Sequence, residues 1–185
     1  MRVIAGELGG RRLEAPAGTD TRPTSDRARE ALFNSLQSRL DLDGAVVADL
    51  FAGTGALGIE AWSRGAGHVT FVEQDRRALA AIRHNLSTLG IDESTTHVVA
   101  GDAARWRPRV GDRLDVVLAD PPYEFAAWSE LLDGLPADVV VAESDRPIEV
   151  DGWEVVRVRR HGAATITTLV PAAAPEDADR PATDH

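Results

Sequence analysis

The stretch VVADLFAGTGALGIEA, residues 46–61, joins a short apolar run to a helical segment through three glycines. The apolar run, Ala45–Leu50, has the length and the β-branched content of a buried strand. The helical segment expected after it is Leu57–Arg64. Glycines let a backbone approach a ligand closely, and a helix N-terminus offers N–H donors that have no partner within the helix. The sequence therefore predicts a strand–loop–helix unit whose loop can bind a ligand.

Beyond this unit, short apolar runs alternate with helical stretches. In Arg76–Leu89, leucine and isoleucine recur at three- and four-residue spacing on one helix face. Apolar strands separated by helices are typical of a parallel sheet that is covered on both faces, so we expect helices between the first four strands and a doubly wound α/β fold. The other strands expected here are His68–Val72, Thr96–Ala100, Leu114–Ala119 and Val139–Ala142.

Both ends of the sequence depart from this alternation. Trp153–Arg159 and Ala164–Val170 are joined by a short turn without a helix, which predicts a C-terminal antiparallel hairpin. Five α/β units and a hairpin suit a seven-stranded sheet better than the six-parallel-strand dehydrogenase plan. Near the N-terminus, a helix is expected over Thr24–Leu40, with Thr24 or Ser25 as its cap. Ahead of it, Arg2–Ala5 and Arg11–Glu14 flank a glycine-rich turn and predict a small β-hairpin.

The composition excludes several classes of protein. The chain has 185 residues, a net charge of -10 and no cysteine, which excludes a disulfide scaffold, a thiolate zinc site and a cysteine nucleophile. All 20 basic residues are arginine, so a catalytic lysine and a P-loop lysine are excluded as well. We find no apolar run long enough for a membrane span and no signal peptide, so a soluble cytoplasmic protein is expected.

The charge is unevenly distributed along the chain. Residues 1–40 carry seven arginines and five acidic residues, whereas residues 171–185 carry one arginine and four acidic residues. The part between them therefore has a net charge of -9. We expect a hairpin arm over residues 1–23, a folded domain over 24–170 and a disordered acidic tail over 171–185. The mildly basic arm keeps nucleic acid among the possible partners, although the net charge argues against it.

Acidic residues at the ends of the strands indicate which ligand the loop binds. Asp49 precedes Gly53 by four residues, and its carboxylate would repel a pyrophosphate but suit an ammonium group. Glu73 ends the second strand, where a carboxylate can accept hydrogen bonds from the ribose hydroxyls of an adenosine. Asp102 follows the third strand, and two interpretations are equally good: it accepts from an adenine amino group, or it caps a helix. Together these residues favour a methionine-derived nucleoside over a dinucleotide.

The tetrad Asp120-Pro121-Pro122-Tyr123 follows the fourth strand and carries the most specific signal. Two prolines fix the backbone and remove two N–H donors, so the loop carbonyls stay available as acceptors. The Asp120 carboxylate and the Pro121 carbonyl can then accept from one exocyclic amino group and orient it for in-line attack. Tyr123 can stack on the planar base that carries the amine. The tetrad predicts a site for methylation of an amine.

These motifs together resemble class I S-adenosylmethionine-dependent methyltransferases, and the tetrad resembles their amino-methylating branch. The N-terminal RVIAGELGGRRLEAP and TRPTSDRAREALFNSL are similar to the RsmD family in particular, whose members are bacterial 16S rRNA guanine-N2-methyltransferases. The resemblance covers about residues 1–170 and implies the seven-stranded Rossmann-like methyltransferase fold, with a C-terminal antiparallel hairpin and a small N-terminal hairpin and helix extension. The acidic tail departs from the family pattern.

The resemblance also implies roles for single residues. The catalytic group comprises Asp120, Pro121, Pro122 and Tyr123, which would hold a flipped guanine. S-adenosylmethionine would be bound by Asp49, Phe51, Ala52, Gly53, Gly55, Gly58, Glu73, Gln74, Asp102 and Ala103. The segment with Arg22, Thr24, Asp26 and Arg27 should fold over the cofactor pocket. Candidates for RNA contact are Arg2, Arg11, Arg12, Arg22 and Arg27.

The expected partner is 16S rRNA within the small ribosomal subunit or an assembly intermediate, approached by a monomer that needs no metal. Four alternatives remain open at this point. The same tetrad serves adenine-N6 methylation of DNA or RNA, although a DNA enzyme of that kind would normally need a further recognition domain. A NAD-binding oxidoreductase would leave the tetrad unexplained, and a protein glutamine methyltransferase usually carries Asn in place of Asp120. A non-catalytic RNA-binding assembly factor could also retain these motifs.

Overall fold

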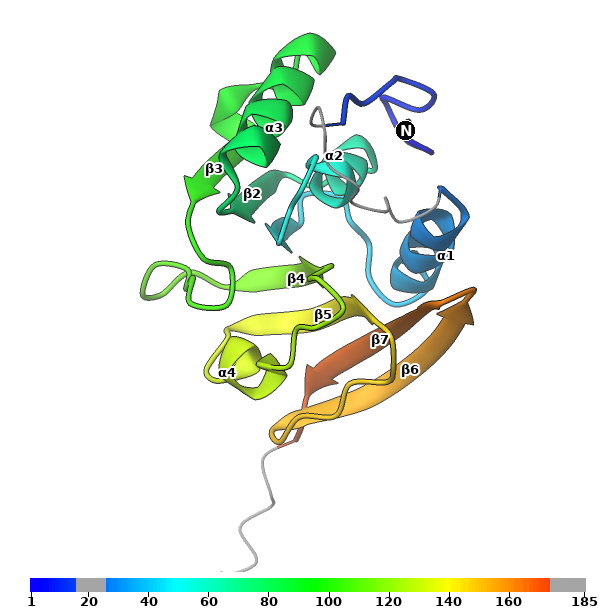
Figure 1. Ribbon diagram of the computed structural model, residues 1–185, viewed down its shortest axis with the longest axis vertical. Helices are drawn as coiled ribbons and strands as arrows, with labels where there is room; N and C mark the ends of the chain where they lie inside the picture. Colours follow the sequence, from blue (N-terminus) through cyan, green and yellow to red (C-terminus); the bar gives the residue numbers. More distant parts are fainter. Residues whose placement is uncertain (16–25, 174–185) are drawn as a thin grey trace, which may run out of the picture.

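Seven strands form one mixed sheet in the computed structural model, which describes residues 1–15 and 26–173 (Figure 1). The strand order is β3-β2-β1-β4-β5-β7-β6, so the first strand of the chain lies in the interior of the sheet. The strands expected from residue 45 onward are all present, and their ends differ from expectation by at most two residues. The strands are β1 (Val46–Leu50), β2 (His68–Glu73), β3 (Thr96–Ala100), β4 (Leu114–Ala119), β5 (Ala137–Ser144), β6 (Trp153–His161) and β7 (Ala164–Pro171).

The direction of the strands confirms the expected topology. β1 to β5 run parallel to one another, whereas β7 is antiparallel to β5 and pairs with β6 as an antiparallel hairpin. The chain reverses its order of placement between β3 and β4, since β4 lies on the other side of β1. In open α/β sheets, ligands bind at such a switch point, outside the carboxyl ends of the strands.

Three helices of two turns or more and one short helix accompany the sheet in the described residues. They are α1 (Asp26–Gln37), α2 (Ala56–Ser63), α3 (Arg76–Leu89) and α4 (Trp128–Leu132), with a 3₁₀ turn at Glu93–Thr95. Helix α3 matches the expected range because Asp75 accepts the first N–H groups at one end and Gly90 adopts a left-handed conformation at the other. None of the helices in residues 1–15 and 26–173 combines the length and apolar character of a membrane span.

The expectation of a helix between β3 and β4 is wrong. Residues 101–113 contain turns but no helix, and the β4–β5 connection holds only the five residues of α4. Pro108 has no N–H to continue a helical ladder, and Gly111 has a positive φ of 93°. The connection therefore forms a loop, and this face of the sheet receives less helical cover than the other.

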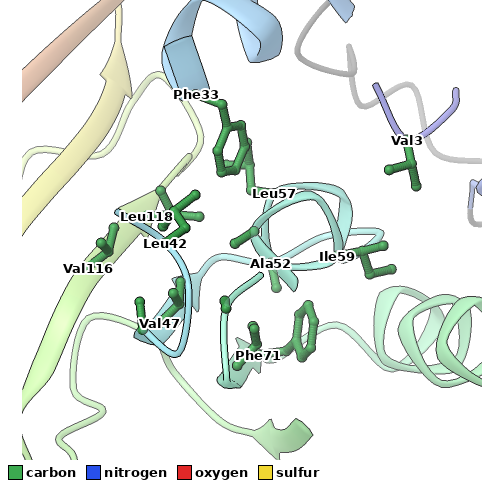
Figure 2. Packing of buried hydrophobic residues seen from close by; sticks show 14 of the residues in the cluster. Val3, Phe33, Leu42, Val47, Ala52, Leu57, Ile59, Phe71, Val116 and Leu118 are labelled. Carbon is green, nitrogen blue, oxygen red and sulfur yellow. The ribbon is translucent and has the colours of Figure 1, made fainter. Parts of the chain in front are cut away.

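Alternate side chains of the inner strands pack into two separate cores, one on each face of the sheet. In β4, Val116 and Leu118 pack into the core beneath α1, α2 and α3, while Val117 and Ala119 pack into the core beneath α4. Figure 2 shows the first core, with Phe33 of α1 and Leu57 of α2 above the side chains of the sheet. The three helices lie on one face of the sheet, as Figure 1 also shows.

The expected N-terminal hairpin is reduced to one antiparallel bridge between Arg2 and Arg12. Residues 1–15 form a strap across the helices, because Val3, Leu8 and Leu13 are buried in the core that α1, α2 and α3 share. Gly6 allows the strap to approach α2 closely, since a Cβ there would lie 1.7 Å from the Ser63 carbonyl oxygen. The strap therefore shares the core of the sheet. The expected helix cap at Thr24 or Ser25 lies outside the described residues, as does the tail beyond Ala173.

A buried carboxylate fastens the strap to α2. Glu60 is fully buried, and its side chain accepts hydrogen bonds from the backbone N–H groups of Ile4 at 2.7 Å and Ala5 at 3.1 Å. The same carboxylate pairs with Arg64 at 2.7 Å, and Arg29 of α1 lies 4.0 Å away. Burial lowers the pKa of Arg29, while the charges of Asp26 and Glu60 raise it. The strap, α1 and α2 thus meet at one internal charge cluster.

Candidate active site

Three carboxylates from neighbouring strands gather at the carboxyl edge of the sheet. Asp49 lies in β1, Glu73 ends β2 and Asp120 follows β4, and these three strands are adjacent. Burial raises the pKa of Asp49 well above its ordinary value, and the negative charges of Asp120 and Glu73 raise it further. The edge is therefore a region of negative potential, which suits a cationic ligand and opposes a pyrophosphate.

Asp49 is more deeply buried than the sequence suggested. The residue is only 1% exposed, and its Oδ2 accepts a hydrogen bond from the N–H of Gly58 at 2.8 Å. Gly58 is in the first turn of α2, so the carboxylate satisfies one of the N–H groups that have no partner within that helix. Asp49 thus ties β1 to α2 on either side of the glycine loop. Direct contact with a cofactor remains a prediction for both residues.

We predict that Asp49→Asn stabilises the fold in a pH-dependent way. Because the folded-state pKa of Asp49 lies above 3.8, its ordinary value, the folded protein holds this proton more tightly than the unfolded chain. The wild type therefore loses free energy of unfolding as the pH rises from 3.8 through the folded-state pKa, whereas the asparagine has no proton to lose. Urea denaturation should show the variant's advantage growing over this window and then levelling off. An advantage that shrinks with rising pH would contradict the assignment.

Glu73 connects the end of β2 to the glycine loop. Its Oε2 accepts from the N–H of Gly53 at 2.9 Å, and its Oε1 accepts from the N–H groups of Gln74 at 2.8 Å and Asp75 at 2.9 Å. Gln74 is exposed, and Asp75 caps α3. The carboxylate is half-buried at the same edge as Asp49, so it can exchange a backbone partner for the hydroxyl groups of a sugar.

The glycine loop leaves its backbone approachable at one position. Gly53, with φ 55°, has no atom nearer than 3.9 Å to the place of a Cβ, whereas Gly55 and Gly58 face the side chain of Phe71. At Gly58 a Cβ would lie 2.3 Å from the Phe71 ring, so this glycine lets α2 pack closely on β2. Phe51 also has a positive φ, of 60°, at the turn out of β1. The loop therefore offers Gly53 to a ligand and uses Gly55 and Gly58 for packing.

Asp102 caps a turn rather than the helix that the capping interpretation expected, since residues 101–113 contain no helix. Its Oδ1 accepts from the N–H of Ala104 at 3.0 Å, and its backbone carbonyl accepts from Arg105 and Trp106, which closes a turn. Ala103 is 3% exposed and packs into the core beneath α4. Asp102 itself remains exposed at the carboxyl end of β3, so an additional contact with an adenine stays a prediction. Ala52, in the glycine loop, is also buried at 8% exposure.

The proline tetrad lies directly beside the end of β1. Asp120 donates its backbone N–H to the carbonyl of Leu50 at 3.5 Å, and Pro121 is buried. Pro122 is exposed, and its carbonyl accepts from the N–H of Phe125 at 2.8 Å, closing the turn. Tyr123 is 47% exposed, an unusual amount for a large aromatic residue in this protein. An exposed ring beside a carboxylate can receive a planar base.

Two contacts at this edge could not be read from the motifs. Phe51 meets Phe125 edge-on at 5.1 Å between ring centroids, and Phe125 meets Trp128 of α4 at 5.0 Å. These rings join the glycine loop to the proline tetrad, at a value of about 0.5–1.5 kcal/mol per aromatic pair. The available signal was aromatic residues at both strand ends, but that signal does not specify which rings meet.

A fourth carboxylate, Glu143, was missed as well. It is 5% exposed near the end of β5, and it follows Ala142, which pairs with Ala119 of β4. Asp120 follows Ala119 in the same way, so the two acidic residues are neighbours in the register. An acid after the apolar run of β5 was the available signal, similar to that of Asp49.

The arginines expected to contact RNA are found on different elements. Arg2, Arg11 and Arg12 are exposed on the strap, where Arg11 donates to the carbonyl of Thr88 at the end of α3 at 3.4 Å. Arg27 is exposed in the first turn of α1, and Arg22 lies outside the described residues. Arg11 therefore lies at the C-terminal end of α3, far from the carboxyl edge of the sheet. Contact with RNA stays a prediction for all of these residues.

Comparison with known proteins identifies relatives of this chain in both sequence and structure. The family model described as conserved hypothetical protein 95 matches residues 1–170. YlbH of Bacillus subtilis is 40% identical over 166 residues, which are 81% of this chain and 85% of that protein. Ribosomal RNA small subunit methyltransferase D of Escherichia coli is 38% identical over 133 residues, which are 72% of this chain and 65% of that protein. The solved structure of yhhF from Escherichia coli has a TM-score of 0.80 at 32% identity, covering 94% of this chain and 99% of that one.

Proposed function

We propose that this chain, which belongs to the conserved hypothetical protein 95 or RsmD family and has the class I methyltransferase fold, methylates the exocyclic N2 amine of a guanine in 16S rRNA. The methyl donor in this proposal is S-adenosylmethionine. The observation that supports it most directly is the pairing of Asp120-Pro121-Pro122-Tyr123 with the carboxylates at the carboxyl edge. The family's relatives named as small-subunit methyltransferases supply the expected RNA.

The residues of the edge fit this cofactor. When bound, S-adenosylmethionine supplies a sulfonium methyl group that an amine can attack directly, with S-adenosylhomocysteine leaving as the neutral thioether. Asp49, Glu73 and Asp120 give the edge a negative potential that attracts a cation and would oppose the pyrophosphate of NAD. The open backbone at Gly53 and the carboxylate of Glu73 would receive the ribose end. Asp49 would act chiefly through the helix that it anchors.

The amine would be held by the tetrad. The Asp120 carboxylate and the Pro121 carbonyl accept hydrogen bonds from its two N–H groups, and Tyr123 covers one face of the base. An amine that has gained a methyl group becomes strongly acidic and passes its proton to Asp120 or to water, so no metal is needed. The guanine must leave any helix that it occupies, at a cost of a few kcal/mol, to reach a site at the end of a buried strand.

Adenine-N6 methylation uses a similar grip and is the second candidate reaction. An exocyclic amine and two acceptors do not distinguish the two purines. Relatives named as small-subunit ribosomal RNA methyltransferases favour ribosomal RNA as the substrate, and the family resemblance favours guanine. An assembly factor without activity would have no need of an exposed aromatic ring beside Asp120.

Deleting the gene and mapping the methylated nucleotides of ribosomal RNA by mass spectrometry tests the proposal. We expect the loss of a single N2-methylguanine from the small-subunit RNA, restored by the wild-type gene. Loss of an N6-methyladenine instead would support the second reaction. An unchanged ribosomal RNA profile would reject both reactions on this substrate.

A further inference from the structure

A row of arginines follows the outermost strand of the sheet. Arg157, Arg159 and Arg160 belong to β6, and Arg39 follows α1 and joins them by donating to the carbonyl of Val156 at 3.3 Å. Arg157 donates in turn to Ser38 Oγ at 3.2 Å. Figure 1 shows the end of β6 beside α1. We call Arg39, Arg157 and Arg159 the hairpin arginine row.

A β-bulge sets the direction of this row. Val155 pairs with Leu169, whereas Arg157 pairs with Thr168, so Val156 is an extra residue in β6. Because of that insertion, Arg157 and Arg159 fall on the face of the sheet that carries α1. The register supports this, since Arg159 pairs with Ile166, which is buried in the core beneath α1, whereas Arg160 pairs with Thr165 and lies on the opposite face. Without the bulge, Arg157 would turn to the opposite face.

The row leads to the edge that holds Asp120. β6 runs in the same direction as β4, because β5 is parallel to β4 and both β5 and β6 are antiparallel to β7. Arg159 near the end of β6 therefore lies at the carboxyl edge. Three strand spacings separate β6 from β4, about 14 Å at about 4.8 Å each. A substrate presented to Asp120 would extend over this distance if it is a nucleic acid.

Because the carboxyl edge is negatively charged, RNA can bind there only if positive charge lies beside it. The negative charges of Glu73 and Asp120 repel phosphates, so the backbone of an RNA is attracted from beside the site. Arg39 and Arg159 are exposed, and Arg157 is half-buried. Acidic residues near the row in the described residues include Asp41, two positions after Arg39, Glu143 in β5, and Asp145, which pairs with Arg146 at 3.9 Å.

We infer that the hairpin arginine row binds the phosphate backbone of the RNA whose guanine enters the site. This inference rests on the proposed function. A guanidinium holds phosphate oxygens in a two-pronged arrangement, and phosphate contacts fix the register of a nucleic acid on a protein. The row thus orients the RNA from the side of the sheet opposite to β3. It does not involve the strap arginines, and it adds a surface to the protein's contact with RNA.

The double variant Arg39→Ala with Arg159→Ala, which removes the two exposed members of the row, tests this. The control is Arg109→Ala with Arg113→Ala, which removes two arginines just before β4, near the amino edge. Binding is measured by filter binding across a range of salt concentrations, to a 16S rRNA transcript and to small subunits from a deletion strain. We expect about tenfold weaker binding to both probes and a flatter salt dependence, because each lost phosphate contact lowers the slope by about one. Cofactor affinity should stay at the wild-type value.

Each result has a defined meaning. Equal binding by the variant and the control would overturn the inference. Weaker binding to subunits alone, with unchanged binding to the transcript, would also overturn it and would indicate an acidic ribosomal protein as the partner of the row. Methylation by the wild type is measured separately. A wild type that binds RNA through the row but methylates none of it would reject the proposed function and leave the RNA surface standing.

Discussion

Asp120→Ala is expected to reduce methyl transfer by at least about 10²–10³-fold while leaving the affinity for S-adenosylmethionine near that of the wild type. A fixed acceptor aimed at the reacting group is worth about this much in other active sites. Asp120 occupies the turn out of β4, beside Leu50 at the end of β1, and its side chain can be removed without opening a core. Single-turnover methylation of small subunits from a deletion strain, with calorimetric titration of the cofactor, measures both quantities.

Glu124→Ala is the matched control for this variant. Glu124 is an exposed acid four residues further along the same loop, so its loss changes the charge of the region without touching the tetrad. It should retain nearly full activity. The activity of Asp120→Asn should fall between those of Asp120→Ala and Glu124→Ala, because the amide keeps one acceptor oxygen but can neither carry the charge nor take up a proton. Full activity of Asp120→Ala would reject the proposed role of the tetrad.

The parallel part of the sheet was predictable because local signals agree there. Thr96–Ala100 and Leu114–Ala119 match the observed strands residue for residue, since each is an apolar run bounded by polar or turn-forming residues. The antiparallel hairpin was predictable for the same reason, from two runs and a short turn. Helix α4 was not predicted, because its five residues are too few to show a helical period.

The strap and the charge cluster could not be predicted from local pattern. Glu60 looks like an ordinary surface residue of a short helix, yet it is fully buried because residues 1–15 cross above it. The sequence indicated a hairpin there, but the observed backbone of Ile4 and Ala5 bonds to Glu60, more than fifty positions away. Contacts of this range leave no periodic signal in the chain.

The acidic residues of the candidate site could be predicted from the sequence, but the contacts that surround them could not. The spacing of Asp49, Glu73 and Asp120 after apolar runs placed all three at one edge, and the structure brings them close enough to influence one another. The bond from Gly58 to Asp49 and the contact of Phe51 with Phe125 depend on how α2 and the tetrad turn pack. Sequence spacing does not define that packing.

Glu60→Ala is expected to lower the free energy of unfolding by about 3–5 kcal/mol, because removing one member of a buried ion cluster leaves the others without compensation. Arg29 is 1% exposed, and its Nε and Nη1 make no hydrogen bond with the described residues. Without Glu60 the remaining carboxylate beside it is the half-exposed Asp26, 3.0 Å away. The N–H groups of Ile4 and Ala5 would lose their acceptor too. Urea denaturation monitored by tryptophan fluorescence measures the loss.

A double variant separates the charge cluster from simple loss of packing. In Glu60→Leu with Arg29→Met, both charges are replaced by apolar side chains of similar size, so the double variant should lose clearly less stability than the two single variants together. It also keeps the test valid if Glu60→Ala fails to fold. Glu93→Ala, which removes an exposed acid beside β3, should change stability by no more than about 0.5 kcal/mol. Strictly additive losses would mean that Arg29 and Glu60 act independently, and would contradict the charge cluster.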